Sequence, residues 1–239
     1  MSVGTVARTL AELLFPPRCL ACGARCAGGP YDTLCTACLA TLEMRRDLVC
    51  PVCGARRYDL SPCHTSPLRA LGSALEFRTP AVRDLLHAAK FKGVSRALLP
   101  LADRLADFTR AVALPLLPPT PMLLVPIPLS PARERERGFN QAQVVAERLA
   151  AALPGRFEVL AGAVRRTKAT KPQTDAPDIA ARARNVAGAF ALVRPEPLAH
   201  RTVILVDDVF TSGATMLECA RTLRAGKPAL ILGLTVARA

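Results

Sequence analysis

The sequence predicts an α/β domain built on a largely parallel sheet, preceded by a small cysteine-rich region. After residue 121, short apolar runs typical of strands alternate with apolar residues at helical spacing. This alternation favours a mainly parallel sheet that helices cover on both faces. Eight of the nine cysteines lie before residue 64. We therefore expect an N-terminal helix and a zinc-binding cysteine-rich region in residues 1–70, and the α/β domain in residues 71–239.

Each expected element follows from one run of residues. Apolar residues at helical spacing predict helices, and short apolar runs predict strands. The proline-rich stretch 114–121 ends the second helix of the α/β domain and connects it to the first central strand. The helices are expected at 5–15, 82–93, 96–113, 140–153 and 214–225, and the strands at 122–129, 157–164, 188–193, 203–208 and 229–237.

The composition indicates an anionic partner. The formal net charge is +13 and the isoelectric point about 10.0, which favours nucleic acid or phosphorylated ligands through counterion release. Free use of arginine by a GC-rich genome is the alternative explanation. No apolar run reaches the length of a membrane span, and Arg8 and Glu12 interrupt the N-terminal apolar stretch. We expect a cytoplasmic protein without membrane insertion.

The cysteine spacing predicts zinc. Two Cys-x-x-Cys pairs separated by twelve residues supply four thiolates, enough for a closed tetrahedral site with a structural role. A third pair is followed by one cysteine and a histidine, which predicts either a possible second zinc site or a metal-free remnant. Cys26 is a spare cysteine, and Cys219 is expected in the core. The expected ligands are Cys19, Cys22, Cys35 and Cys38 for the first zinc, and Cys50, Cys53, Cys63 and His64 for the second.

The stretch from Val203 to Thr215 carries the strongest functional pattern. Val203 to Val206 suit a central strand buried on both faces, and ligands of open α/β sheets bind beyond the carboxyl ends of such strands. Asp207 and Asp208 lie at that end, and small or hydroxylated residues follow. Backbone N–H groups at the start of the next helix suit a phosphate, and the paired carboxylates suit the hydroxyls of a sugar. The alternatives are an ordinary Asp-Asp turn and a helix cap.

This stretch resembles the motif with which type I phosphoribosyltransferases bind phosphoribosyl pyrophosphate (PRPP). The resemblance implies that Asp207 and Asp208 are catalytic and contact the ribose hydroxyls. It also implies that magnesium is held mainly by the pyrophosphate and ribose oxygens, with the carboxylates in support. The residues that would enclose the 5′-phosphate are Thr211, Ser212, Gly213, Ala214 and Thr215.

Two further segments carry groups suited to phosphate. In the first, Arg137 with Asn140 and Gln141 could bind phosphate or the edge of a base, whereas the preceding Arg-Glu alternation fits a solvated helix face. The second, 165–185, is a long basic segment between two expected strands. It either closes over a bound pyrophosphate or is a solvated, disordered loop. Its candidate ligands are Arg166, Lys168, Gln173 and Arg182.

The chain as a whole resembles the ComF family, which is linked to bacterial competence and DNA uptake. The resemblance rests on the cysteine-rich N-terminal region, "KFKG" at 90–93, "VPIPLS" at 125–130, "RGFNQA" at 137–142, the basic segment and the PRPP motif. Lys168 stands where the family usually has a second arginine, which keeps the charge and loses bidentate phosphate binding. Ser66 stands where the family usually has the fourth cysteine of the second zinc site. The resemblance implies a type I phosphoribosyltransferase-like domain and a double zinc ribbon.

Two functions are compatible with these features. The first is a magnesium-dependent phosphoribosyltransferase acting in DNA uptake or nucleotide-related metabolism. The second is a non-catalytic module that binds single-stranded DNA, works with DNA-uptake proteins and uses PRPP as a ligand. Sparse aromatic residues make such DNA binding mainly electrostatic. A sequence-specific zinc-finger regulator is disfavoured, because no recognition helix follows the cysteine pairs. The acceptor and the oligomeric state stay open at this point.

Overall fold

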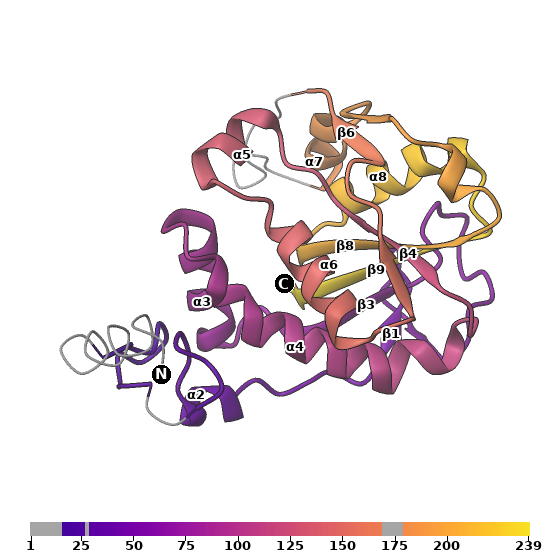
Figure 1. Ribbon diagram of the computed structural model, residues 1–239. Coiled ribbons are helices and arrows are strands. Elements are labelled where there is room, and N and C mark those ends of the chain that lie inside the picture. Colours follow the sequence, from indigo (N-terminus) through magenta and orange to yellow (C-terminus); the bar gives the residue numbers. More distant parts are fainter. Residues whose placement is uncertain (1–15, 27–28, 169–178) are drawn as a thin grey trace.

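A seven-stranded sheet forms the centre of the protein in the computed structural model, which describes residues 16–26, 29–168 and 179–239 (Figure 1). Its strand order is β2-β1-β3-β9-β8-β4-β5. The last five strands of this order are parallel: β3 (Leu71–Glu76), β9 (Leu230–Arg238), β8 (Thr202–Phe210), β4 (Met122–Pro126) and β5 (Phe157–Val159). The expected α/β fold with a mainly parallel sheet is confirmed.

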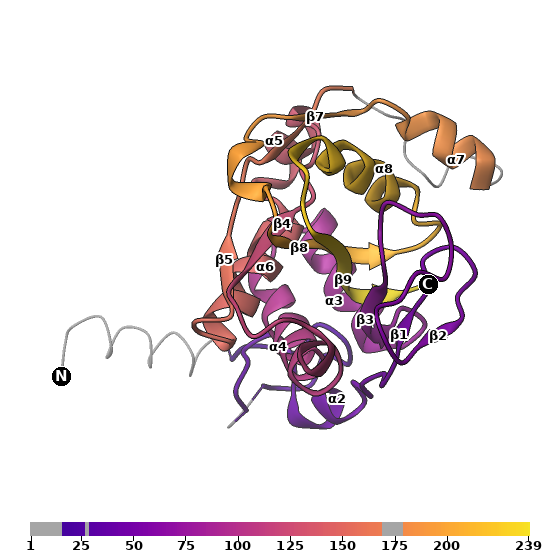
Figure 2. The same ribbon diagram turned by 90° about the vertical axis from the view of Figure 1, so that its right-hand side faces the viewer.

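The cysteine-rich region contributes two short strands to the same sheet. β1 (Leu48–Val49) pairs antiparallel with both β2 (Arg56–Arg57) and β3. Figure 2 shows β1 and β2 beside β3 at the edge of the sheet. The third Cys-x-x-Cys pair, Cys50 and Cys53, is thus joined to the α/β domain by backbone hydrogen bonds.

Helices cover both faces of the sheet. α4 (Leu99–Phe108) and α6 (Gln141–Ala152) pack on one face, and α8 (Ala214–Leu223) packs on the other, as Figure 1 shows. A separate two-stranded antiparallel sheet of β6 (Val164–Arg166) and β7 (Phe190–Leu192) packs against α8. The other α-helices in the described residues are α2 (Thr36–Ala40), α3 (Pro80–Phe91), α5 (Pro131–Arg137) and α7 (Ile179–Val186).

The apolar run of β8 explains why this strand is central. Ile204 and Val206 belong to the core that α4 and α6 cover, whereas Val203 and Leu205 belong to the core under α8. All four are fully buried, and burying each such side chain contributes about 1.5–3 kcal/mol. A strand with apolar residues on both faces is stable only between two helical layers. The polar residues that follow this apolar run therefore lie toward the carboxyl end of the strand, where a ligand can reach them.

Several element boundaries differ from those that the sequence predicts. The run 157–164 holds β5 and only the first residue of β6, and these two strands lie in different sheets, because the chain turns around Gly162. β8 continues beyond the acid pair to Phe210. The helix expected at 96–113 is divided into a 3₁₀ turn, α4 and a π-helical turn. The helix expected at 5–15 lies outside the described residues.

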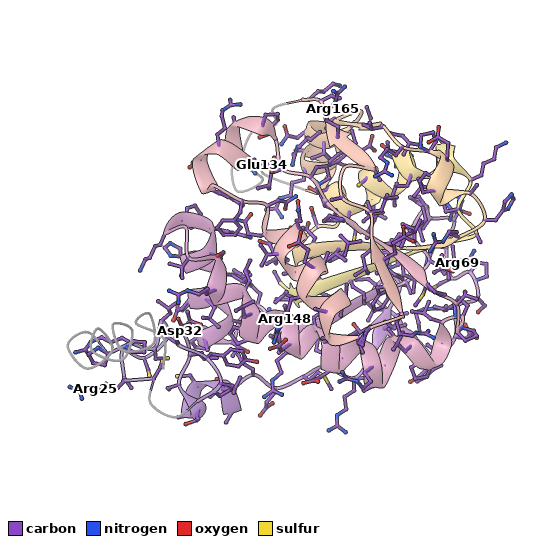
Figure 3. All side chains as sticks on the ribbon, viewed as in Figure 1. Arg25, Asp32, Arg69, Glu134, Arg148 and Arg165 are labelled. Atoms are coloured by element: carbon purple, nitrogen blue, oxygen red, sulfur yellow. The ribbon has the colours of Figure 1, made fainter. Side chains whose placement is uncertain are left out.

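Hydrogen bonds and an ion pair join the loop between the first two Cys-x-x-Cys pairs to the helical layer. The Tyr31 hydroxyl donates to Asp103 of α4 at 2.7 Å, and Arg148 of α6 donates to the same carboxylate at 2.6 and 2.9 Å. Asp32 forms an ion pair with Arg96. Figure 3 shows Asp32 among the N-terminal loops and Arg148 on the helical layer. Among the described residues, no helix is long and apolar enough to cross a bilayer.

Candidate functional site

A pocket of about 850 Å³ opens at the carboxyl ends of β8 and β4. Three stretches of chain line it: α3 with the turn before it, the segment from β4 to the start of α6, and the segment from β8 to the start of α8. Two basic side chains from the 165–185 segment complete the wall. The pocket therefore lies where ligands of open parallel sheets bind.

The acid pair lies inside β8, at the point where one neighbouring strand ends. β4 pairs with β8 only as far as Val206, whereas β9 continues beside β8 to Phe210. Asp207 and Asp208 thus follow the last residue of β8 that β4 covers. Lys90 from α3 places its Nζ 2.7 Å from Oδ2 of Asp208, and Asp208 is only 7% exposed. The ion pair compensates part of the cost of burying that carboxylate.

Asp207 carries the most perturbed carboxyl of the pocket. Burial, followed by the negative charge of Asp208, raises the pKa of Asp207 to about 7. The backbone N–H of Asp208, which donates to Oδ1 of Asp207 at 2.8 Å, acts in the opposite direction, as do the charges of Lys90 and Arg166. Strongly perturbed carboxyls in a cleft are typical of ligand or catalytic sites.

The start of α8 is shaped for close approach to an anion. Gly213 is its N-cap with φ of +75°, and a Cβ at this position would lie 2.5 Å from the Phe210 ring. Only glycine fits this turn. Thr211, Ala214 and Thr215 line the pocket beside it, so the N-terminal turn of α8 faces the cavity. Ser212 does not line the pocket. Its hydroxyl is buried and has no hydrogen-bond partner in the described part of the chain.

The segment between β4 and α6 uses Asn140 to build its turn. Oδ1 of Asn140 accepts from the N–H of Ala142 and caps α6, while Nδ2 donates to the Ile127 carbonyl at 3.1 Å. Gly138 ends α5 in the left-handed region with φ of +77°. These bonds fix the direction in which α6 begins, so its N-terminus also faces the pocket.

Arg137 and Gln141 form a coupled pair in the wall. Nη1 of Arg137 donates to Oε1 of Gln141 at 2.9 Å. Gln141 is 2% exposed, and among the residues described its Nε2 has no hydrogen-bond partner. A buried amide donor without a partner is costly, and a ligand acceptor in the pocket would remove that cost. Burial lowers the pKa of Arg137, whereas the charge of Asp208 raises it.

Of the candidate residues in the basic segment, the structure places some in the wall of the pocket and others outside it. Arg166 is buried, lies over the Phe190 ring at 5.5 Å and lines the pocket, as does Arg182 of α7. The neighbouring Arg165 points outward at the edge of the molecule in Figure 3, which is the alternation expected of a strand. Lys168 donates to the Ala187 carbonyl at 3.2 Å and does not line the pocket. Gln173 lies outside the described residues.

Sequence reasoning missed the part of the pocket that α3 supplies. Lys90 belongs to the "KFKG" run, which by itself gives no indication that its ammonium contacts Asp208. Arg83, His87 and Phe91 recur every four residues on the same helix and line the pocket. This spacing was the available signal, since residues four apart share a helix face.

The first cysteine cluster has the donor set of a structural zinc site. The sulfurs of Cys19, Cys22, Cys35 and Cys38 all lie within 4.8 Å of one another. Burial acts to raise the pKa of Cys19, but backbone N–H groups of Cys35, Cys22 and Ala21 outweigh it and lower that pKa to about 6. A thiolate formed at neutral pH is the species that binds zinc.

The second cluster includes the histidine. Sγ of Cys50, Cys53 and Cys63 and a ring nitrogen of His64 lie within 4.8 Å of one another, with Nδ1 of His64 3.5 Å from Sγ of Cys50. Although burial raises it, the pKa of Cys50 is lowered to about 6 by backbone N–H groups and by His64. Cys26 belongs to neither cluster. Cys219 is buried in the core under α8, as expected.

Known proteins are similar to the cysteine-rich region and to most of the chain. A family model described as a double zinc ribbon domain matches residues 10–66. The chain is 32% identical over 200 residues to the DNA utilization protein YhgH of Salmonella typhi, covering 80% of this chain and 83% of that protein. It is 27% identical over 221 residues to the competence protein ComFC of Bacillus subtilis, covering 87% and 85% of the two chains.

The chain belongs to the ComF family. Its N-terminal region is a double zinc ribbon, which agrees with the two clusters of zinc-binding side chains. Competence protein F of Haemophilus influenzae is 36% identical over 130 residues, or 53% of this chain and 52% of that protein. A solved hypoxanthine phosphoribosyl transferase of Trypanosoma cruzi aligns over 63% of this chain and 75% of its own, with 12% identity and a TM-score of 0.36.

Two zinc ions per chain are expected because the ribbon holds two four-donor clusters. Elemental analysis of the purified protein should give two zinc ions. Cys53→Ser and His64→Ala should each reduce the content toward one, because three donors leave the tetrahedral site open. Cys26→Ser is the matched control, since Cys26 lies outside both clusters, and it should retain two. One zinc in the unaltered protein would contradict a second site.

Asp207 should make the ligand-free protein less stable as the pH rises. The unfolded chain loses this proton near pH 3.9, about the ordinary value for aspartate, whereas the folded protein keeps it until about pH 7. Between these values the native state binds more protons, so its stability falls with rising pH and levels off above about pH 7. In magnesium-free buffer, Asp207→Asn should raise the thermal unfolding midpoint more at pH 8 than at pH 5. An equal change at both values would contradict the raised pKa.

Proposed function

We propose that this ComF-family protein binds PRPP with magnesium and transfers its phosphoribosyl group to an acceptor. The observation that supports this most strongly is the placement of two adjacent carboxylates beside the N-terminal turn of α8, within one pocket. The carboxylates favour hydroxyl donors, whereas the N-terminal turn of the helix favours an anion, and one ligand must satisfy both. A sugar that carries a phosphate does so.

The acid pair would hold the ribose. Each carboxylate of Asp207 and Asp208 can accept hydrogen bonds from two adjacent sugar hydroxyls, and hydrogen bonds to charged groups contribute about 1.5–3 kcal/mol each. The backbone N–H groups from Thr211 to Thr215 and the hydroxyls of Thr211 and Thr215 would enclose the 5′-phosphate, whereas the buried Ser212 side chain does not line the pocket and Ser212 would act through its backbone N–H. Gly213 keeps this turn open, because any side chain there would meet Phe210.

The basic wall would hold the pyrophosphate. Arg137 and Arg166 are partly or wholly buried and line the pocket, and Gln141 offers an amide donor without a partner among the described residues. Arg182 adds a further charge from α7. Lys168 and Gln173 of the same basic segment stay candidate ligands of the pyrophosphate, although Lys168 does not line the pocket and Gln173 lies outside the described residues. Asn140 would act by orienting the N-terminus of α6.

Magnesium would enter with the pyrophosphate, whose charge it neutralises. Lys90 already forms an ion pair with Oδ2 of Asp208. This carboxylate would therefore support the magnesium ion, and the pyrophosphate and ribose oxygens would be its main ligands. The protein itself would position the anomeric carbon and stabilise the leaving group with fixed arginine charges. Such positioning and preorganised electrostatics supply most of the catalysis in displacements of this kind.

The names of the relatives indicate a cellular context for this activity. They are called DNA utilization and competence proteins, and we infer a role for this chain in DNA uptake or in nucleotide metabolism linked to it, in the cytoplasm.

PRPP binding should depend on the acid pair. Calorimetric titration of PRPP with magnesium should show binding to the unaltered protein, and Asp207→Asn/Asp208→Asn should weaken it at least about a hundredfold, because two charged hydrogen bonds are lost. Asp107→Asn/Glu147→Gln removes two solvent-accessible carboxylates outside the pocket and should leave the affinity unchanged.

Unchanged PRPP affinity in the Asp207→Asn/Asp208→Asn protein would refute the proposed site. Catalysis is tested separately, by following pyrophosphate release from PRPP with nucleobases, amines and DNA as acceptors. Binding without pyrophosphate release for any acceptor would leave PRPP as a ligand and exclude the transferase activity.

A non-catalytic DNA-binding module is the second candidate, and the net charge of +13 favours it. In this function PRPP acts as a ligand that the protein senses. Binding of a single-stranded oligonucleotide should then weaken steeply as salt rises, since phosphate contacts release counterions. An affinity that does not change with salt would exclude this function.

A further inference from the structure

One wall of the pocket is aromatic and apolar, and the proposed function leaves it without a role. The residues that form this wall are Phe77 in the turn before α3, and Leu86, His87 and Phe91 on α3. We call it the α3 wall. The phosphates require charged partners, so none of the groups assigned to PRPP above would contact it.

The α3 wall contains an exposed pair of rings. The centroids of His87 and Phe91 lie 4.8 Å apart with their planes tilted by 41°. Phe91 is 67% exposed. The chain has no tryptophan, two tyrosines and eight phenylalanines, and Phe77, Phe91 and Phe210 all line this pocket. One exposed phenylalanine is ordinary, but rings gathered in a pocket are a surface on which another ring can stack.

Lys90 fixes the distance between the α3 wall and the acid pair. It lies between His87 and Phe91 in the last turn of α3, and its ammonium contacts Oδ2 of Asp208 at 2.7 Å. The rings are therefore attached to the site of the ribose by one short ion pair. A ligand group that contacts the α3 wall must be adjacent to the sugar.

The sheet order places the α3 wall opposite the pyrophosphate side. β3, which leads into α3, lies on one side of β8 with β9 between them, and β4, which leads to Arg137 and Gln141, lies on the other. An acceptor approaches the anomeric carbon from the face that the leaving pyrophosphate does not occupy. The position of the α3 wall is the one such an acceptor needs.

The charges around the α3 wall indicate the kind of acceptor. Among the described residues the carboxylates that line the pocket are Glu136, Asp207 and Asp208, and none lies on α3. The charged groups that α3 contributes are Arg83 and Lys90. A cationic amine would meet rings and positive charges there, whereas a flat ring with acceptor atoms would match both.

We propose that the α3 wall is the acceptor subsite and binds a planar nitrogen heteroaromatic ring of the nucleobase class. This rests on the proposed phosphoribosyl transfer. A ring nitrogen gives its lone pair to the anomeric carbon, and the bond from that carbon to pyrophosphate breaks. Pyrophosphate leaves with the bonding electrons, and the proton of the ring N–H passes to water.

The test uses 2-aminopurine, whose fluorescence falls when its ring stacks, and the absence of tryptophan keeps the background low. Ribose 5-phosphate, pyrophosphate and magnesium fill the donor half without permitting transfer. Titration should show quenching by the unaltered protein. Phe91→Ala should weaken the affinity about tenfold, the loss of one stacking partner, Phe91→Leu should weaken it similarly, and Phe91→Tyr should retain it.

Tyr58→Ala is the matched control, because Tyr58 is an aromatic residue that is 83% exposed and lies outside the pocket. It should leave 2-aminopurine binding unchanged. PRPP affinity, measured by calorimetry on Phe91→Ala, should also be unchanged, which shows that the pocket is intact.

The outcomes separate the two proposals. If PRPP does not bind the unaltered protein, the proposed function fails. If PRPP binds but 2-aminopurine does not, or if Phe91→Ala and Tyr58→Ala behave alike, only the acceptor subsite is overturned. It is also overturned if Phe91→Ala weakens binding of a single-stranded oligonucleotide and not of the free base.

Discussion

The pocket depends on two neighbouring carboxylates placed where a buried strand emerges from the sheet. Negative charge is costly there, because Asp208 is almost fully buried. Burial, followed by the charge of Asp208, raises the pKa of Asp207 to about 7. Lys90 offsets part of this cost through its 2.7 Å contact with Asp208. The same contact joins the last turn of α3, whose apolar face packs in the core, to β8 beside the pocket. One ion pair thus links the electrostatics of the pocket to its shape.

The double zinc ribbon is built into this architecture. β1 and β2 extend the sheet next to β3, and the Tyr31–Asp103–Arg148 bonds fasten the first cluster to α4 and α6. β3 leads into α3, and α6 begins at the pocket. Loss of either zinc would therefore disturb elements that border the ligand site, since small metal-bound segments lack a core of their own.

The sequence allowed much of the fold and the acid pair to be predicted, because both depend on local patterns. The run from Val203 to Val206 is apolar on both faces, and only a central parallel strand accommodates it. The contact of Lys90 with Asp208 could not be predicted, because it joins residues far apart in the chain. The single strand expected at 157–164 was wrong, since an apolar run does not reveal a turn that transfers the chain to another sheet. Ser66 obscured the second zinc cluster, in which His64 lies with the three cysteines.

A crystal structure of the protein with PRPP and magnesium would show directly whether the acid pair and the start of α8 bind PRPP. We expect the ribose hydroxyls on Asp207 and Asp208, the 5′-phosphate against the N–H groups of Thr211 to Thr215, and the pyrophosphate beside Arg137 and Gln141. The α3 wall should remain open next to the anomeric carbon. A ligand whose ribose contacts neither aspartate, or whose 5′-phosphate lies away from the start of α8, would contradict it.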